Sequence, residues 1–231
     1  MGGAGEGREK AMNEAAFMGA VTASITHEVQ NVLAIIQQSA GLMGDILDLS
    51  RRETLKSLGF RKGFQYHDKF SSLIAAINEQ VKRGSNLSDG LNRLAHVPDA
   101  TADTTDLAQA TGLLFALIGR IARKRRVEFV LDAVDGAHVA ACPPMQALMA
   151  LYGVARVLID ALSGRAVHVA VTAREGGPVV DFIFPEDGGT PAIVLPEPLC
   201  DREEAGAPTV AVQADRIRLL FPPGDVQAAG R

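Results

Sequence analysis

Three side chains with complementary chemistry lie within five residues of one another, at His27, Glu28 and Asn31. A neutral imidazole is a good nucleophile near neutral pH. A carboxylate that accepts a hydrogen bond from one ring nitrogen fixes the tautomer and makes the other nitrogen more nucleophilic. An amide one helical turn away can orient a phosphoryl group or a water molecule. These residue types at this spacing indicate reversible phosphoryl transfer through His27.

The helical pattern around His27 predicts that its side chain faces solvent. Apolar residues recur in steps of three and four, and both Ile25 and Val29 belong to this row. His27 is two residues from each, which is about 200° around a helix. Asn31 follows four residues later and shares the face of His27. A solvated His–Glu dipeptide without chemistry is the simpler alternative. The remaining histidines are expected to be structural: His67, His96, His138 and His168.

The segment from Ile25 to Ile36 resembles the phosphoacceptor box of two-component sensor histidine kinases. In that box His-Glu is followed by two variable residues, then Asn or Thr, and usually Pro-Leu. Val32 stands here where the family usually has proline. The resemblance implies that His27 is phosphorylated and that Glu28 is the acid/base partner. It also implies that Asn31 acts when phosphate is removed from a bound response regulator.

The second half of the chain is similar to the ATP-binding domain of these kinases but departs from it where nucleotide would bind. The Asn-bearing helix of the family aligns with Gln146–Leu162, and its Asn positions fall at Gly153 and Val157. Neither residue can ligate Mg²⁺, which needs oxygen ligands. The adenine loop has only a weak remnant, Asp187-Gly188-Gly189, which also suits an ordinary turn. We therefore expect no self-phosphorylation by ATP, no cofactor and no metal, with Mg²⁺ only on the partner receiver domain.

A phosphoacceptor hairpin joined to such a domain resembles the dimeric histidine phosphotransferases that are thought to derive from histidine kinases. The resemblance implies that His27 accepts phosphate from the aspartate of one response regulator receiver domain and passes it to that of another. No receiver-like segment is visible in the sequence, so donor and acceptor should be separate proteins. The alternatives are a non-catalytic dimeric scaffold that binds response regulators and a divergent sensor histidine kinase.

Two long helices must position His27. The main apolar row of the first helix comprises Met18, Val21, Ile25, Val29, Val32, Ile36, Ala40, Met43 and Leu47, and a second row comprises Leu33, Leu42, Ile46 and Leu49. A stripe this wide suits a four-helix bundle better than a two-stranded coil, so we predict that two hairpins pair as a homodimer. Gly59 and Gly63 bracket the predicted turn, and Pro98 follows the second helix.

The predicted fold class is α+β. An N-terminal antiparallel helical hairpin that forms a dimeric four-helix bundle precedes a degenerate α/β sandwich that resembles the histidine kinase ATP-binding domain. The sandwich is expected to contain helices at 107–124 and 144–162, strands at 127–131 and 138–141, and hairpins at 166–184 and 209–221. The predicted parts are a flexible tail (1–8), the hairpin (9–97), a linker (98–105), the sandwich (106–223) and a second tail (224–231). The resemblance covers about residues 11–223.

Composition limits the class of partner. With 47% hydrophobic and 22% charged residues, the chain is typical of globular proteins. A net charge of −4 gives no argument for nucleic acid or an anionic membrane as partner. The basic run at 120–126 is best explained as a helix C-terminus. Two cysteines are too few for a disulfide framework, and there is no uninterrupted run of about 18 apolar residues for a membrane span. We therefore expect a cytoplasmic protein.

Overall fold

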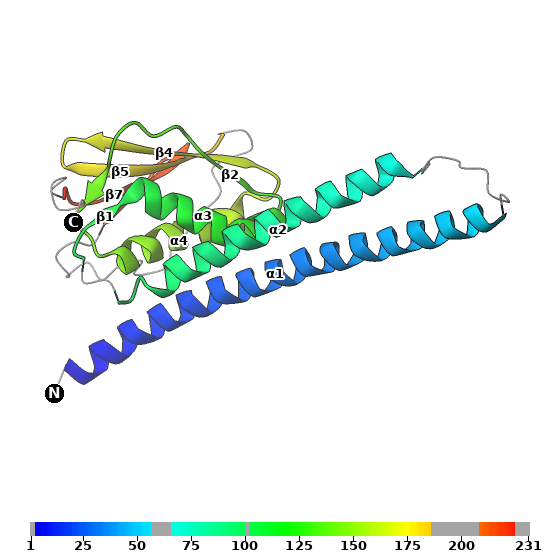
Figure 1. Ribbon diagram of the computed structural model, residues 1–231. Helices are drawn as coiled ribbons and strands as arrows, with labels where there is room; N and C mark the ends of the chain where they lie inside the picture. The colour runs from blue at the N-terminus through cyan, green and yellow to red at the C-terminus, as the bar shows by residue number, and fades with distance from the viewer. Residues whose placement is uncertain (1–2, 57–65, 100–101, 186–207, 225–231) are drawn as a thin grey trace. The chain divides into compact units, whose positions relative to one another are not determined.

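The computed structural model describes residues 3–56, 66–99, 102–185 and 208–224. The chain divides into two compact units, of which one combines 1–24 with 90–231 and the other is 25–89. Figure 1 shows the elements in chain order: α1 (Gly3–Lys56), α2 (His67–Ala95), β1 (Thr105–Asp106), α3 (Leu107–Lys124), β2 (Glu128–Leu131), β3 (Val139–Ala140), α4 (Pro144–Ala161), β4 (Ala166–Arg174), β5 (Gly177–Ile183), β6 (Thr209–Val212) and β7 (Arg216–Leu220).

The unit 25–89 is an antiparallel hairpin of α1 and α2, as predicted. Two contacts fix the direction of the helices. The Tyr66 hydroxyl, just before the start of α2, donates a hydrogen bond of 3.0 Å to the carboxylate of Glu53, which lies near the end of α1. A Cβ atom built on Gly84 would lie 3.3 Å from Val32 Cγ1. The end of α1 therefore lies beside the start of α2, and the middle of α1 lies beside the later part of α2, so the two helices are antiparallel. The predicted turn at Gly59 and Gly63 lies outside the described residues.

The buried side of α1 follows the predicted main row through Val21, Ile25 and Val32, and departs from it further along the helix. Ile25, Val32, Ser39 and Ile46 are buried, and they repeat every seven residues. Ala40 and Leu47, which the predicted row includes, are exposed. The predicted row advances about 3.6 residues per step and so follows a straight helix, whereas a seven-residue repeat follows a helix that winds around its neighbour. The true row also includes a serine, which an apolar pattern does not detect.

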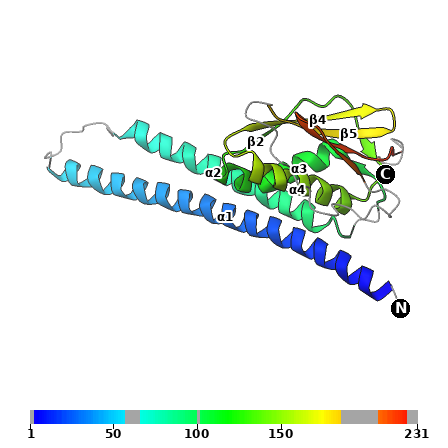
Figure 2. The same cartoon turned by 180° about the vertical axis from the view of Figure 1, so that it is seen from behind.

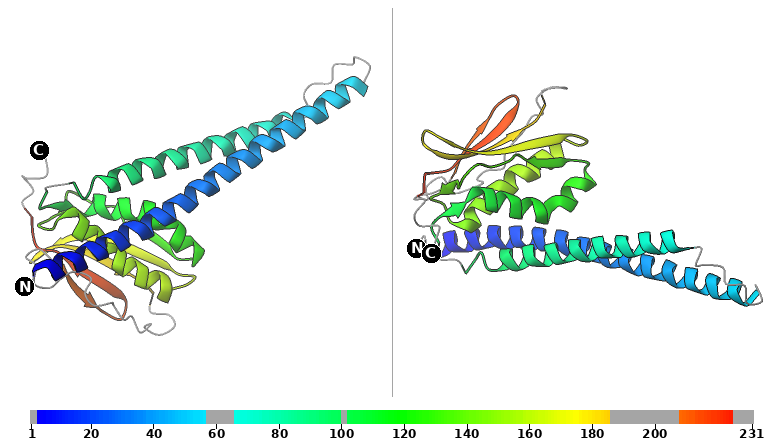
Figure 3. Two further views of the ribbon diagram at one scale, coloured as in Figure 1. Left: turned by 90° about the horizontal axis from the view of Figure 1, so that it is seen from below. Right: turned by 45° about the horizontal axis from the view of Figure 1, so that its top comes forward.

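The other unit contains a mixed five-stranded sheet in the order β2-β4-β5-β7-β6. Among the described strands, β2 and β4 form the one parallel pair of this sheet. Side chains alternate along β4, where Val167, Val169 and Val171 are buried while His168 and Thr172 are exposed. Figure 3 shows the strands as one layer and α3 with α4 as a second layer against one face. The predicted α+β sandwich is therefore confirmed.

Aromatic packing joins the two layers of the sandwich. Phe115 of α3 stacks on Phe129 of β2 with 4.8 Å between ring centroids, and it meets Phe182 of β5 edge-on at 6.3 Å. Phe129 and Phe182 also pack edge-on, at 6.5 Å. Such aromatic clusters bury a large apolar area and prefer these geometries. Figure 2 shows α3, β2 and β5 from behind.

The predicted elements of this unit lie close to the observed ones. Asp106 caps the start of α3, because its Oδ1 atom accepts hydrogen bonds from the backbone amides of Ala108 (3.0 Å) and Gln109 (3.2 Å). The hairpins β4–β5 and β6–β7 form where turn residues predict them. The two-residue strand β1, which pairs with β3, takes up the end of the predicted linker. A strand so short carries no alternating pattern, and it was not predicted.

The first helix begins earlier than predicted. It starts at Gly3 rather than Glu9, so residues 3–8 are helical instead of forming a flexible tail. Gly3, Gly5 and Gly7 disfavour helix, but extending an existing helix needs no new nucleus. This end of α1 packs within the sandwich unit, because Phe17 meets Tyr152 of α4 edge-on at 5.3 Å. Burial raises the pKa of Tyr152 above its ordinary value.

The middle of α1 is strongly apolar. Within the part of the chain that the structure describes, Glu14–Glu53 is one helix that length and composition alone would allow to cross a membrane. The sequence expectation counted uninterrupted apolar runs, whereas here the apolar residues are spread along one long helix. Only 17% of its most apolar stretch is buried inside the chain. Much of this apolar surface is therefore uncovered in a single chain.

A substitution at Gly177 tests the close packing of β5 against β7. Gly177 has φ +136°, and a Cβ there would lie 2.1 Å from the Phe221 carbonyl oxygen. We expect Gly177→Ala to lower the free energy of unfolding by about 3 kcal/mol or more, measured by urea denaturation. Gly176→Ala is the control, because Gly176 has φ +99° but no atom within 4 Å of a built Cβ. It should cost only about 1–2 kcal/mol; equal losses would contradict the steric explanation.

Candidate phosphoacceptor site

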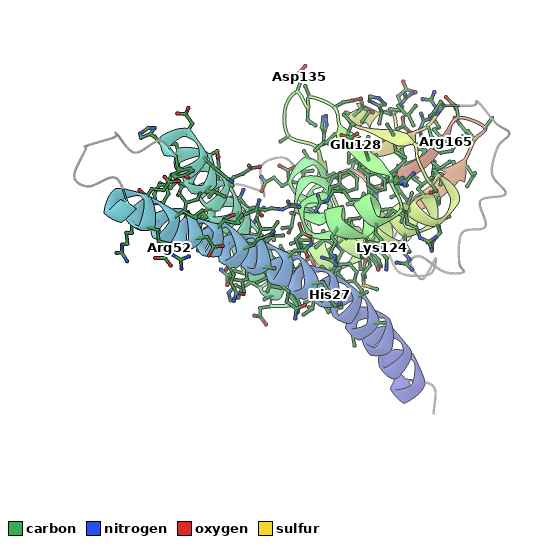
Figure 4. The ribbon with its side chains drawn as sticks, turned by 90° about the vertical axis from the view of Figure 1, so that its right-hand side faces the viewer. His27, Arg52, Lys124, Glu128, Asp135 and Arg165 are labelled. Carbon is green, nitrogen blue, oxygen red and sulfur yellow. The ribbon has the colours of Figure 1, made fainter. Side chains whose placement is uncertain are left out.

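His27 lies on α1 with its side chain exposed, as its helical phase predicts. Figure 4 labels it on this helix. Its neighbours on the inner side behave as expected, since Ile25 is buried and Val29 is half-buried. A ring held on a regular helix has a fixed backbone and an open side, which allows a second protein to approach it.

Asn31 is also exposed and lies one helical turn from His27. The structure therefore brings His27 and Asn31 to the same face of α1. An amide there supplies both a hydrogen-bond donor and an acceptor beside the imidazole. This geometry agrees with a role in orienting a phosphoryl group or water, and that role itself stays a prediction.

Glu28 does not share that face, although sequence reasoning placed its carboxylate beside the ring. Its side chain is buried, with 5% of the residue exposed. The Glu28 Oε1 atom forms an ion pair with Nη2 of Arg83 on α2. Consecutive helical residues point about 100° apart, so a residue next to an exposed histidine readily faces inward. The acid/base role of Glu28 stays a prediction.

Arg83 is the site residue that sequence reasoning missed. It lies 55 positions after Glu28, so no local motif links the two residues. One weak signal was present: Arg83 lies seven residues after Ala76 on α2, and both residues are half-buried. An arginine that is half-buried on a row with this spacing indicates a position where an ion pair can form between two helices.

The close approach of the two helices explains how Arg83 reaches Glu28. Gly84 follows Arg83 directly, and Val32 lies one turn after Glu28. A Cβ on Gly84 would be only 3.3 Å from Val32 Cγ1, which is tighter than most contacts of this kind. The glycine therefore lets the backbone of α2 lie near α1 where the ion pair forms.

The described residues offer no alternative metal centre. No group of three or more His, Cys, Asp or Glu side chains that could hold a metal ion occurs among them. Gly153 and Val157, where the resemblance would place asparagines, both lie on α4 and are half-buried. Neither side chain carries an oxygen that could ligate a hard cation. The predicted remnant loop at Asp187-Gly188-Gly189 lies outside the described residues.

The stability of the ion pair can be measured directly. Arg83→Met leaves the buried Glu28 carboxylate without its partner on α2. Because the Arg83 side chain is 40% exposed, we expect a loss of about 1–3 kcal/mol in the free energy of unfolding, less than for a fully buried pair. The double variant Glu28→Met/Arg83→Met should recover most of this loss, since matched apolar side chains replace the pair.

Arg156→Gln is the control for that measurement. Arg156 pairs with Asp160 on the exposed side of α4, and both side chains are about half exposed. Its loss should change the free energy of unfolding by less than about 1 kcal/mol. A double variant at Glu28 and Arg83 that is less stable than Arg83→Met alone would show that the buried charges stabilise the hairpin by more than their desolvation costs.

Comparisons with known proteins give similar structures only. No family model matches the sequence, and no curated protein matches it. The Acinetobacter baumannii histidine kinase AdeS is similar at 10% identity and TM-score 0.40, over 86% of this chain and 98% of that one. A bacterial phosphotransferase is similar at 13% identity and TM-score 0.42, over 90% of this chain and 96% of that one.

A third similar structure is the histidine kinase ThkA in complex with the response regulator protein TrrA. The identity is 13% and the TM-score 0.38, over 94% of this chain and 64% of that chain. At this level the chain is similar to histidine kinases and to a phosphotransferase, and its own function is inferred from its own residues.

Proposed function

We propose that this chain is a dimeric histidine phosphotransfer protein, which accepts phosphate on His27 from the aspartate of one receiver domain and passes it to the aspartate of another. The observation that carries the proposal is the exposed His27 on a helical hairpin, with Asn31 on the same face. A solvent-exposed histidine without chemistry would need neither a place on a helical hairpin nor an amide side chain on the same face. The proposed partners are response regulator receiver domains, and the proposed location is the cytoplasm.

The proposed chemistry is a reversible displacement at phosphorus. The lone pair of a neutral His27 ring nitrogen attacks the phosphorus atom of the receiver's aspartyl phosphate. A nitrogen–phosphorus bond forms, the bond between phosphorus and the aspartate oxygen breaks, and the carboxylate leaves with the bonding electron pair. The second ring nitrogen keeps its proton until it loses it to solvent. The receiver supplies the Mg²⁺ that neutralises the phosphoryl oxygens.

The source of the phosphate distinguishes the proposed phosphotransfer protein from a kinase. ATP-dependent phosphorylation needs oxygen ligands for Mg²⁺ beside the nucleotide. The positions where the resemblance would place these ligands carry Gly153 and Val157. We therefore propose that phosphate arrives from a receiver rather than from ATP, and that the α+β unit contributes no nucleotide chemistry.

A radiolabel assay tests the function. We expect the protein to acquire acid-labile label from a receiver domain loaded with radiolabelled acetyl phosphate, and none from ATP and Mg²⁺ alone. His27→Gln should abolish the label, because the nucleophile is lost. His67→Gln is the matched control, since His67 is another exposed histidine of the hairpin and should leave labelling unchanged. Label from ATP alone would indicate a kinase, and no label from any receiver domain would indicate a scaffold.

Uncovered apolar rows on the hairpin support the proposed dimer. Ile35, Leu42 and Leu49 of α1 are exposed, at 38%, 41% and 49%, and they repeat every seven residues. Ile74 and Val81 of α2 are exposed with the same spacing. Rows with a seven-residue repeat are the packing surface of helical bundles. Because each side chain is already about half covered, covering the rest contributes about 1 kcal/mol per residue, and five such residues together favour association.

A second copy covers these rows better than a membrane does. The same part of α1 also exposes the polar residues Gln30, Asn31, Gln37 and Gln38. Polar side chains inside hydrocarbon are costly when they lack partners. In a four-helix bundle the apolar rows turn inward and these polar residues stay in water. The phosphoacceptor face then stays open while the apolar rows are covered.

Charge placed in the exposed row tests the dimer. We expect Leu42→Glu to shift the protein toward monomer in sedimentation velocity at micromolar concentration, because two like charges would meet in an apolar interface. Val212→Glu is the control, since Val212 is similarly exposed on β6 at 46%. It should leave the sedimentation coefficient unchanged. A wild-type chain that sediments as a monomer at these concentrations would rule out the proposed bundle.

A further inference from the structure

The Glu28–Arg83 ion pair occupies a place where the helical pattern calls for apolar side chains. Glu28 lies seven residues before Ile35, so it continues the apolar row of Ile35, Leu42 and Leu49 toward the N-terminus. It is nevertheless charged and buried, and it pairs with Arg83 across the hairpin. Of Glu28, Ile35, Leu42 and Leu49, only Glu28 is charged, and it is the residue next to His27.

Stability does not explain this placement. Removing the Glu28 carboxylate from water costs several kcal/mol, and its attraction to the partly exposed guanidinium of Arg83 only partly returns it. Well-packed apolar side chains at the same positions are usually as stable or more stable. Charged groups arranged beside a nucleophile at the expense of stability are characteristic of functional sites. The pair is thus better explained by what it does for His27 than by what it does for the hairpin.

We propose that Arg83 is a catalytic residue that binds the phosphoryl group carried on His27, and that Glu28 is its positioning residue. The inference rests on the proposed phosphotransfer function. Glu28 Oε1 contacts Nη2 at one end of the guanidinium, while 40% of the Arg83 side chain is exposed. A guanidinium has five N–H donors in a flat fork that fits phosphate oxygens. One arginine can therefore be held by a buried carboxylate and still present donors at the surface.

The chemistry explains why a cation is needed there. During transfer the phosphoryl group leaves the Mg²⁺ of the receiver and becomes bonded to a ring nitrogen of His27. Its oxygens keep their negative charge, and the described residues of this chain contain no group of three or more His, Cys, Asp or Glu side chains that could hold a metal ion there. Arg83 would stabilise that charge both in the transition state and on phosphohistidine. Glu28, on the inner side of α1, would hold one end of the guanidinium and leave its other N–H donors available to the phosphoryl group.

The test measures transfer at saturating donor with two donors of different size. One donor is a receiver domain loaded with radiolabelled acetyl phosphate, and the other is phosphoramidate, a small molecule that docks on no protein surface. We expect Arg83→Gln to lower the rate about 10- to 100-fold with both donors, with little change in KM for the receiver. Arg83→Lys should recover part of the rate, because it keeps the charge but not the fork.

The matched control is Lys82→Gln. Lys82 is adjacent to Arg83, carries the same charge and is exposed, so general electrostatic attraction of the donor would be lost equally in both variants. We expect the rate of Lys82→Gln to stay within about twofold of wild type. A loss with the receiver but not with phosphoramidate would assign Arg83 to docking and overturn its catalytic role.

Variants of Glu28 distinguish a positioning role of this residue from an acid/base role. If Glu28 only holds Arg83, Glu28→Gln and the double variant Glu28→Gln/Arg83→Gln should both resemble Arg83→Gln, and the pH profile of the rate should keep its shape. Losses that multiply in the double variant, or a pH profile that changes in Glu28→Gln alone, would overturn the positioning role. The apolar double variant Glu28→Met/Arg83→Met, which should fold stably, must also lose at least about tenfold in rate.

The outcomes also separate this inference from the function on which it rests. If His27→Gln still acquires label, the proposed phosphotransfer through His27 fails. If His27→Gln is inactive while Arg83→Gln transfers at the wild-type rate, only the role of Arg83 fails.

Discussion

The packing of α1 against α2 is the constraint on which the candidate site depends. A seven-residue repeat on α1, formed by Ile25, Val32 and Ser39, fixes which side of this helix is buried. Once that side is fixed, His27 must face solvent and Glu28 must face inward, because the two residues are adjacent on one helix. The close approach at Gly84 then brings a cation of α2 to the buried carboxylate. The packing of α1 against α2 thus determines the environment of His27, Glu28 and Arg83.

Sequence patterns predicted the elements well wherever the signal was local. The start of α3 follows from one capping aspartate, and the hairpin of β4 and β5 follows from alternating valines and a glycine-rich turn. The exposure of His27 follows from two apolar neighbours. The true buried row of α1 was harder to predict, because Ser39 belongs to it while the apolar Leu47 does not. Only a partner helix decides between apolar rows that lie side by side.

Long-range charge pairs could not be predicted. Asp181 is 3% exposed in the middle of β5, where apolar neighbours suggest another core residue. The structure shows Arg218 of β7 on both of its carboxylate oxygens, at 2.7 and 2.8 Å. Arg83 and Glu28 form the same kind of pair between helices. Each partner is ordinary in its own segment, and the register of strands or helices brings the two together, so a local pattern does not identify the pair.

The sandwich unit keeps its fold for reasons that do not involve nucleotide. Its two layers are joined by Phe115, Phe129 and Phe182, and by the buried valines of β4. The positions where a nucleotide-binding relative would need oxygen ligands, Gly153 and Val157, add nothing to that aromatic cluster. Polar ligands in a site generally cost stability, because they must be desolvated. A domain whose core lies elsewhere can therefore lack such ligands without losing its fold, and the phosphotransfer that we propose for His27 needs none of them.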